Sequence, residues 1–134
     1  LEVLKSTTTD SSKEINTIFT GEEISDLQKL TRQVYIDEEL IQKVNKLVRN
    51  SRPQNSTSEF VKKWCEWGAG PRAGQALIMC AKARAVLNGR FSVVPDDLKT
   101  LAFPVLRHRI SLNFRAEAEG ITTDDIVKEL QNLI

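Results

Sequence analysis

The stretch from Gly68 to Gly89 constrains the fold most strongly, because it predicts one long helix with little side-chain bulk. Pro71 suits the first helical position, where its missing N–H group costs nothing, and Gly89 suits the left-handed cap after the last turn. The helical wheel is apolar or small outside a narrow stripe formed by Gln75, Met79, Lys82 and Val86, although Arg84 and Asn88 interrupt the apolar side near the end. A helix of this kind is normally buried, so we expect the other helices to pack around it.

Arg72 stands out because it lies in the first turn of this helix, where the helix dipole is already positive. A cation at that position destabilises an exposed helix by about 0.3–1 kcal/mol, so helix stability does not explain the arginine. A bound anion would explain it, since free N–H groups, the dipole and the guanidinium would all point at one phosphate. The alternative from residue types alone is a local ion pair, for example with Glu66.

Composition places the chain among ordinary globular domains. The 134 residues suffice for one domain with a core, and 40% hydrophobic with 28% charged residues fits that class. A net charge of +1 offers no general attraction for nucleic acid or an anionic membrane. The sequence shows no apolar run of transmembrane length and no signal-peptide pattern, so we expect no membrane partner. Cys65 and Cys80 lack the spacing of a metal site, which favours reduced thiols, no metal and a cytoplasmic protein.

Capping residues and helical periodicity predict two helices before the central one. Thr20 and Glu23 form a capping box that opens a helix ending near Tyr35. Asp37 caps a second helix that ends near Ser51. The predicted inward-facing positions of this second helix are Leu40, Ile41, Val44, Leu47 and Val48.

Further elements are predicted after the central helix. Pro95 starts a helix that Pro104 should break or kink, and Thr122 caps the last helix. The alternating segments Phe91–Val93 and Ser111–Phe114 could pair as very short strands. Together these elements predict a mainly α fold, a small bundle of about five helices around the Ala-rich helix.

Paired acidic residues occur four times, as Glu22–Glu23, Glu38–Glu39, Asp96–Asp97 and Asp124–Asp125. Paired carboxylates can serve as general acid and base. Each pair, however, falls in a predicted first helical turn, where the dipole favours negative charge. We therefore interpret the pairs as helix starts and find no complete catalytic constellation.

A local basic cluster, formed by Arg107, His108, Arg109 and Arg115, is the one feature that could contact nucleic-acid phosphates. On a near-neutral domain such a cluster is usually solvated or salt-bridged, so nucleic acid is an unfavoured partner. His108 is the only histidine, and a structural zinc site is not expected.

Two tryptophans, Trp64 and Trp67, lie in a short apolar segment just before the central helix. They could stack on a base, but tryptophans three apart in such a segment are more often core anchors. The segment Gly68–Gly74 contains glycines but no lysine, so by itself it is not a phosphate-binding P-loop.

The segment Gly68–Ala73, followed by a Leu- and Ala-rich helix, resembles the sensor 2 motif of MoxR-family AAA+ ATPases. Further segments resemble the same family in the same order: Thr20–Ile24 with Leu27–Gln28, Asn88–Arg90, Val94–Leu98, Pro104–Arg109 and Glu117–Thr122. The resemblance runs from about residue 15 to the C-terminus, and the ordered series is more specific than any one piece. Val94 departs from the family's usual Thr or Ser, so one helix cap is expected to be missing.

The resemblance implies that residues 15–134 form the C-terminal helical lid of an ATPase. Residues 1–14 would then be a linker or the end of an upstream P-loop α/β domain. In the family the sensor 2 arginine reaches the nucleotide phosphates, links lid position to nucleotide state and helps hydrolysis, and Arg72 occupies its position. Gly70, Pro71 and Ala73 would contact the nucleotide beside it. ATP with Mg²⁺ is the implied cofactor, bound mainly by the upstream domain.

The resemblance also implies partners and a general activity. The partners would be the upstream domain, neighbouring subunits of a ring, expected to be a hexamer, and von Willebrand factor A-type proteins. The activity would be chaperone-like remodelling by the parent ATPase, since the lid alone is not catalytic. An alternative is a stand-alone helical interaction module without a nucleotide role. A weaker third is a small nucleic-acid-binding domain that uses Arg107, Arg109 and Arg115.

Overall fold

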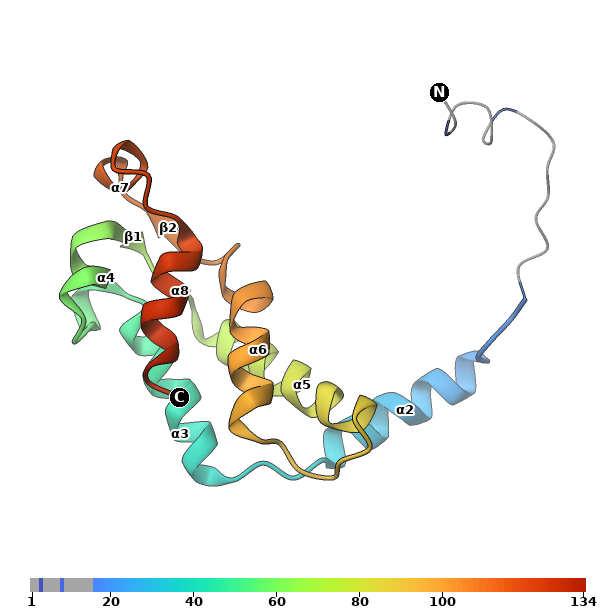
Figure 1. Ribbon diagram of the computed structural model, residues 1–134. Helices are drawn as coiled ribbons and strands as arrows, with labels where there is room; N and C mark the ends of the chain where they lie inside the picture. The colour runs from blue at the N-terminus through green and yellow to red at the C-terminus, as the bar shows by residue number, and fades with distance from the viewer. Residues whose placement is uncertain (1–2, 4–7, 9–15) are drawn as a thin grey trace.

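Figure 1 presents the structure of the chain, a computed structural model that describes Val3, Thr8 and residues 16–134. Its elements in order are α2 (Gly21–Gln33), α3 (Glu38–Asn50), the 3₁₀ turn η1 (Pro53–Asn55), α4 (Glu59–Trp64), β1 (Cys65–Trp67), α5 (Pro71–Leu87), α6 (Pro95–Leu106), β2 (Ser111–Leu112), α7 (Phe114–Ala118) and α8 (Thr123–Gln131). The predicted mainly α fold is confirmed. Apart from Val3 and Thr8, the predicted linker over residues 1–14 lies outside the described residues.

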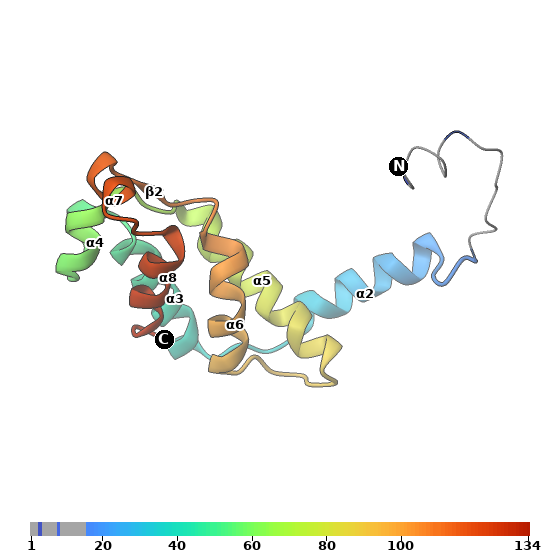
Figure 2. The same cartoon turned by 45° about the horizontal axis from the view of Figure 1, so that its top comes forward.

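Helix α5 lies at the centre of the helix contacts and packs against α2, α3 and α6 (Figures 1 and 2). Its buried residues recur at every fourth position: Ala73, Leu77, Ala81 and Ala85. One side of α5 is exposed: Gln75 and Met79 belong to the stripe that the helical wheel set apart from the apolar surface, and Cys80 is exposed as well. The neighbouring helices α2, α3 and α6 cover the side that carries the buried residues. The alanines on the rest of the surface are small, so little apolar area remains there to be buried.

Helix α8 closes the core by packing on α3, α4 and α6. The largest fully buried side chains of α3, α5, α6 and α8 meet there: Leu47, Leu77, Leu98, Leu106, Ile126 and Leu130. Among the described residues, no helix is both long enough and apolar enough to cross a membrane.

The two short strands pair differently from the prediction. β1 and β2 are antiparallel, with Cys65 opposite Leu112. The predicted partner of the 111–114 segment, Phe91–Val93, is therefore wrong. Ser92 forms an isolated parallel bridge with Tyr35 instead. The reason is the length of α6, whose 12 residues span about 18 Å and hold the two segments at opposite ends.

Helix α6 runs through Pro104 without ending there, so the predicted break is wrong. Pro104 lies near the end of the helix, where its ring removes one hydrogen bond, the one to the Thr100 carbonyl. The helix ends two residues later, at Leu106. The short helix α7, capped by the Asn113 side chain, was not predicted.

The helix starts agree with the sequence analysis. All four acidic pairs lie in first helical turns, in α2, α3, α6 and α8. Thr20 with Glu23 and Thr122 with Asp125 form complete capping boxes. Val94 offers no side-chain cap to α6, as expected, but its N–H group donates to the Asp97 carboxylate at 2.9 Å. In the capping box of α6, the bond from the N-cap backbone to the acidic side chain is therefore present, and the bond that an N-cap side chain would accept is missing.

The two cysteines are expected to differ sharply in reactivity. Cys65 is buried, and burial, with a smaller contribution from Glu66, raises the pKa of its thiol to about 11. Cys80 is exposed on α5. We expect Cys80 to react with a disulfide reagent at least about 10²-fold faster than Cys65 at about pH 8. The Cys80→Ser variant should lose the fast phase in a spectrophotometric assay. Equal rates for both thiols in the native protein would contradict the buried position of Cys65.

Candidate functional site

The start of α5 is an uncompensated positive helix end. Gly70 is its N-cap, with an extended backbone (φ −86°, ψ 175°) and no side chain to accept a hydrogen bond. Pro71 follows at the first helical position, and the first turn of α5 contains no acidic residue. The described helices α2, α3, α6 and α8, in contrast, each begin with two acids. The first turn of α5 therefore lacks the negative charge that would offset its dipole.

Arg72 projects its charge from this positive helix end. Its side chain is exposed, and it makes no hydrogen bond or ion pair with any residue that the structure describes. The alternative of an ion pair with Glu66 is therefore not found. A free guanidinium at a helix N-terminus is suited to an anion with several acceptor oxygens, such as a phosphate group.

The end of α3 fixes the backbone that leads into this site. The Ser51 hydroxyl accepts a hydrogen bond from the Ala69 N–H group at 2.8 Å and donates to the Val48 carbonyl at 2.7 Å. Arg52 Nε donates to the Ala69 carbonyl at 3.0 Å. Both polar backbone groups of Ala69, three residues before Arg72, are thus held by side chains from the end of α3. This arrangement limits where the first turn of α5 can lie.

Gly68 is required because the segment before α5 passes very close to the backbone at the end of α3. A Cβ atom at this position would lie 2.3 Å from the Ser51 carbonyl oxygen and 2.5 Å from the Arg52 nitrogen. Ser51 is fully buried, so its backbone has no free space into which it could move. The sequence marks the glycine, but it gives no sign that Ser51 is its neighbour, because the pair is far apart along the chain.

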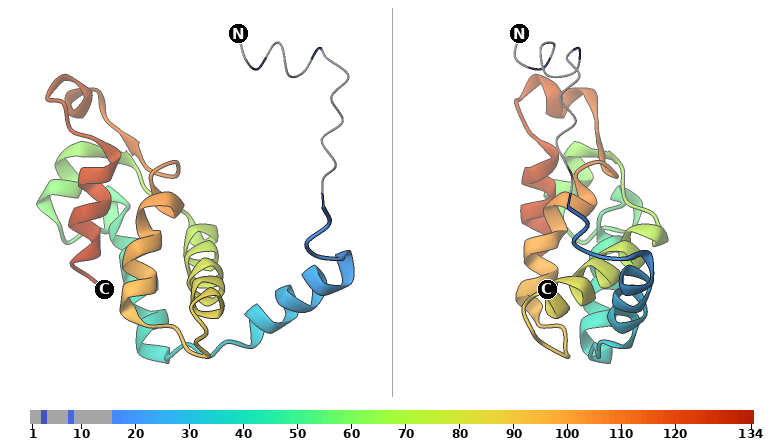
Figure 3. Two further views of the ribbon diagram at one scale, coloured as in Figure 1. Left: turned by 45° about the vertical axis from the view of Figure 1, so that its right-hand side comes forward. Right: turned by 90° about the vertical axis from the view of Figure 1, so that its right-hand side faces the viewer.

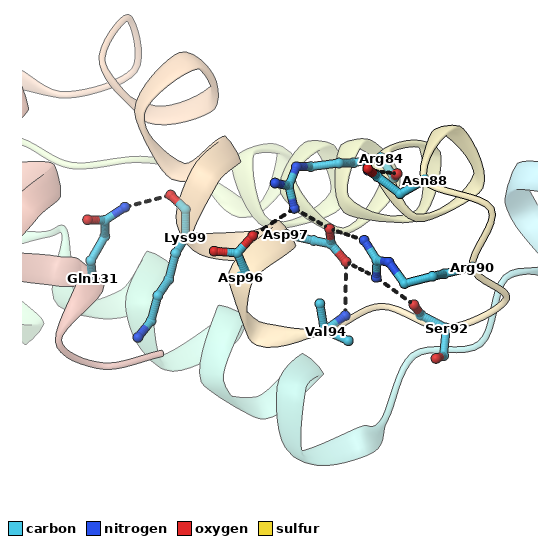
Figure 4. Close-up of polar contacts among 9 residues, drawn as sticks. All are labelled: Arg84, Asn88, Arg90, Ser92, Val94, Asp96, Asp97, Lys99 and Gln131. Atoms are coloured by element: carbon cyan, nitrogen blue, oxygen red, sulfur yellow. Dashed lines mark hydrogen bonds and ion pairs between the residues drawn. The ribbon is translucent and has the colours of Figure 1, made fainter.

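A second polar cluster fixes the other end of α5 (Figure 4). Arg90 donates to both oxygens of the Asp97 carboxylate, at 2.7 and 2.8 Å. Arg84 of α5 donates to the same carboxylate and, at 3.0 Å, to Asp96. The cluster joins the end of α5, the following loop and the start of α6. Sequence reasoning explained Asp97 by the helix dipole and missed these partners.

The side chain of Asp97 is fully buried, and this cluster keeps it ionised. Burial by itself would raise the pKa of the carboxyl. The hydrogen bonds from Arg90, the Val94 backbone and Arg84 outweigh this effect and lower the pKa to about 2. The cluster is therefore structural, with its charges neutralised by one another.

The other candidates lie apart from the Arg72 site or are engaged elsewhere. Arg107 forms a two-pronged ion pair with Asp124, at 2.8 and 3.0 Å, and Arg109 donates to the Val105 carbonyl. These contacts occupy two members of the basic cluster proposed for nucleic acid. In the described part of the chain, no three His, Cys, Asp or Glu side chains gather where they could hold a metal ion.

The two tryptophans lie in different environments. Trp64 is buried and meets Phe60 edge to face, with ring centroids 6.5 Å apart, so the core-anchor prediction is right for it. Trp67 is 69% exposed, so the same prediction is wrong for Trp67. Trp64 is the last residue of helix α4 and Trp67 is the last residue of strand β1, so no single periodicity places the two side chains on one face.

The family described as AAA lid domain matches residues 59–130, more than half of the chain. The class of protein is therefore a lid domain of an AAA-type ATPase. Chaperone MoxR1 of Mycobacterium tuberculosis is 30% identical over 105 residues, which cover 78% of this chain and 28% of that protein. Protein MoxR of Paracoccus denitrificans is 44% identical over 46 residues, covering 34% of this chain and 14% of that protein.

A crystal structure of a candidate ATPase from Cytophaga hutchinsonii has a TM-score of 0.85 and is 31% identical. The match covers 99% of this chain and 41% of that one. The chain belongs to the MoxR family of AAA+ ATPases, as a lid domain. It spans less than a third of the length of MoxR1.

Proposed function

We propose that this chain is the C-terminal lid of a MoxR-type ATPase and that Arg72 is its sensor 2 arginine. The observation that carries the proposal is the free, exposed guanidinium of Arg72 on an uncompensated helix end. Residues 15–134 would form the lid and residues 1–14 the connection to an upstream P-loop domain. The lid would couple the binding and hydrolysis of ATP to its own movement and to ring assembly.

The start of α5 has room for a phosphate group. A Cβ atom added to Gly70 would have no atom within 4 Å, so the backbone there is open to an approaching oxygen. Pro71 and Ala73 flank Arg72 in the same turn. One guanidinium and one helix end are too few groups to hold a whole nucleotide, so ATP with Mg²⁺ would be bound mainly by the upstream domain.

The chemistry assigned to Arg72 is charge stabilisation. Phosphoryl transfer depends mostly on positioning and on neutralising charge that spreads over the phosphate oxygens. A lid that closes would bring the guanidinium to those oxygens, and a lid that opens would withdraw it. The Ala69 N–H group donates to the Ser51 hydroxyl and the Ala69 carbonyl accepts from Arg52, so the backbone before Arg72 would move with the whole domain and not as a loose segment.

The wider setting of the proposal follows from the relatives. One of them is named a chaperone, and we extend this to chaperone-like remodelling by the intact protein. Its partners would be neighbouring subunits of a ring, expected to be a hexamer, and von Willebrand factor A-type proteins. The free thiols of Cys65 and Cys80 fit a reducing cytoplasm.

The testing experiment is ATP turnover by the intact protein, with the upstream domain present, as wild type, Arg72→Ala and Arg72→Lys. We expect Arg72→Ala to lower kcat about 10²-fold, since one donor to the transition state is lost. Arg72→Lys should retain more of the kcat than Arg72→Ala but less than the wild type, because an ammonium group lacks the planar pair of donors of a guanidinium. Gln75→Ala, on the same exposed side of α5, is the matched control and should keep wild-type turnover.

Circular dichroism should show the same helix content in all four proteins, because Arg72 and Gln75 are both exposed. Unchanged turnover in Arg72→Ala would leave the fold standing and remove the nucleotide role. The interaction-module alternative would then be the better one, and the exposed apolar side of α2 is the observation that favours it.

A further inference from the structure

Helix α3 and the turn η1 that follows it line a polar hollow on the surface. Figure 3 shows α3 on the side of the described domain that lies away from the outer end of α2. The hollow has a volume of about 240 Å³, and we call it the α3 hollow. Its lining residues are Gln42, Asn45, Lys46, Arg49, Asn50 and Asn55, none of which belongs to the Arg72 site.

The lining of the α3 hollow is polar throughout and carries two positive charges. Four of the six lining side chains are carboxamides, and the other two are Lys46 and Arg49. Among the described residues, no acidic or apolar side chain belongs to this lining. The hollow therefore offers many N–H donors, which suit an anion, and lacks both the carboxylates that a metal ion needs and an apolar wall for a base or a lipid chain.

Neither of the two cations is neutralised within the part of the chain that the structure describes. The side chains of Lys46 and Arg49 make no hydrogen bond or ion pair with any described residue. Lys43, on the same helix, does pair with a carboxylate, that of Glu39 at 3.0 Å. The helix dipole accounts for Arg49, which lies in the last turn of α3. It does not account for a second cation beside Arg49 in a hollow without an acid, because neighbouring like charges destabilise a helix.

The buried lining residue of the α3 hollow, Asn50, is held at both ends of its carboxamide. It is only 5% exposed, and its Nδ2 atom donates to the Lys46 carbonyl at 2.9 Å. Its Oδ1 atom accepts from the N–H group and the hydroxyl of Thr57, at 2.8 and 2.9 Å. These bonds join the segment after η1 to α3, so the two walls of the hollow are fixed before any ligand arrives. A fixed set of donors binds a small ligand with little loss of conformational entropy.

We propose that the α3 hollow binds a phosphate group with two negative charges, carried by free inorganic phosphate or by a phosphoserine of a partner protein. The planar guanidinium of Arg49 can donate to two phosphate oxygens, and Lys46 supplies the second charge. The hollow is smaller than the pockets of about 300–1,000 Å³ that hold larger organic ligands, which favours a group of phosphate size. The proposal does not depend on the role of Arg72.

Titration of the 134-residue chain with sodium phosphate tests the proposal, followed by NMR chemical shifts at constant ionic strength. The measurement is made at about pH 8, where phosphate carries two charges. We expect saturable shifts with a millimolar dissociation constant at the amides of residues 46–57 and at the side-chain amide of Asn50. Sodium nitrate, whose anion carries one charge, should cause only small shifts that do not saturate.

The double variant Lys46→Gln with Arg49→Gln should bind phosphate at least about ten-fold more weakly, because both charged donors are lost. The matched control is Lys99→Gln with Lys128→Gln, which removes the same total charge from exposed positions on α6 and α8. Its dissociation constant should stay within about two-fold of the wild-type value, because salt screens distant surface charges. Circular dichroism should show unchanged helix content in both variants, since all four side chains are exposed.

Equal weakening in the control would overturn the proposal, because the general charge of the domain would then account for the binding. Phosphate shifts at residues 69–73 with none at the hollow would overturn it too, and the sensor 2 proposal would then stand alone. A phosphoserine peptide that binds the hollow at least about ten-fold more tightly than inorganic phosphate would identify a partner protein as the source, and equal affinity would identify free phosphate. Equally tight binding of the unphosphorylated peptide would overturn the proposal, because the phosphate would contribute nothing.

Discussion

Replacing Asp97 with alanine is expected to lower the free energy of unfolding by about 3 kcal/mol, the lower end of the range for breaking a buried ion pair. The variant removes a fully buried carboxylate that accepts hydrogen bonds from Arg84, Arg90 and the Val94 N–H group. Arg90 would then lose its counter-charge, and Arg84 would keep only the exposed Asp96 as a partner. Both arginines are partly exposed, so water can relieve some of this cost. Chemical denaturation followed by circular dichroism measures the loss.

Asp96→Ala is the matched control for this variant. Asp96 is the preceding residue and accepts a hydrogen bond from the same Arg84, but its side chain is 73% exposed. An exposed ion pair contributes about 0–1 kcal/mol, so the control should be nearly as stable as the wild type. Equal destabilisation by both variants would show that the helix dipole, and not the buried cluster, accounts for the acidic pair.

The pH dependence gives an independent measure of the same cluster. The pKa of Asp97 is about 2 in the folded protein, below the ordinary carboxyl value of 3.8. Its contribution to stability is therefore complete above about pH 4 and is lost as the pH falls toward 2, a total of about 2 kcal/mol. The stability difference between wild type and Asp97→Ala should shrink over this interval and stay constant at higher pH.

Local signals in the sequence were sufficient for most of the fold. The capping boxes at Thr20 and Thr122 act within one turn of helix, so they need no knowledge of distant partners. Periodicity placed the inward positions of α3, of which Leu40, Val44, Leu47 and Val48 are buried and Ile41 is half-buried. The prediction of a mainly α bundle around the Ala-rich helix followed from these local features.

Contacts between segments far apart in the chain could not be predicted from the sequence. The pairing of β1 with β2 depends on where α6 and its neighbours carry the chain, and short strands have no pattern that names a partner. The hydrogen bond between Ser51 and Ala69 likewise joins residues 18 apart. A serine at the end of a helix is too common to indicate such a role.

The residues that carried the family resemblance have different physical roles. Arg90 and Asp97, from two of the matching segments, form the buried ion pair and so maintain the fold. Gly68 maintains it by its lack of a side chain. Arg72 contributes nothing of this kind within the described residues, where it has no partner. The proposal of a phosphate contact rests on this contrast between Arg72 and the other motif residues.

Replacing Gly68 with alanine is the change expected to affect both the fold and the candidate site. The added Cβ atom would lie within 2.5 Å of backbone atoms of Ser51 and Arg52, and backbone cannot swing aside as a side chain can. We expect a loss of about 3 kcal/mol of stability, the upper part of the range for overpacking a tight site. Thermal and denaturant unfolding of the 134-residue chain measure it.

Gly74→Ala is the control that separates this clash from a general effect of losing a glycine. A Cβ atom at Gly74 would lie 3.5 Å from Val44 and Val48, an ordinary contact distance. Because alanine favours a helix interior over glycine by up to about 1 kcal/mol, this variant should be as stable as the wild type or more so.

A small loss in Gly68→Ala would mean that the segment before α5 moves away from Ser51 and relieves the clash. Such a displacement would also move Arg72, and a shift of about 1 Å at a catalytic contact can lower turnover about 10²-fold. The intact Gly68→Ala protein should therefore lose ATP turnover even when it remains folded, and normal turnover would show that the position of Arg72 does not depend on this contact.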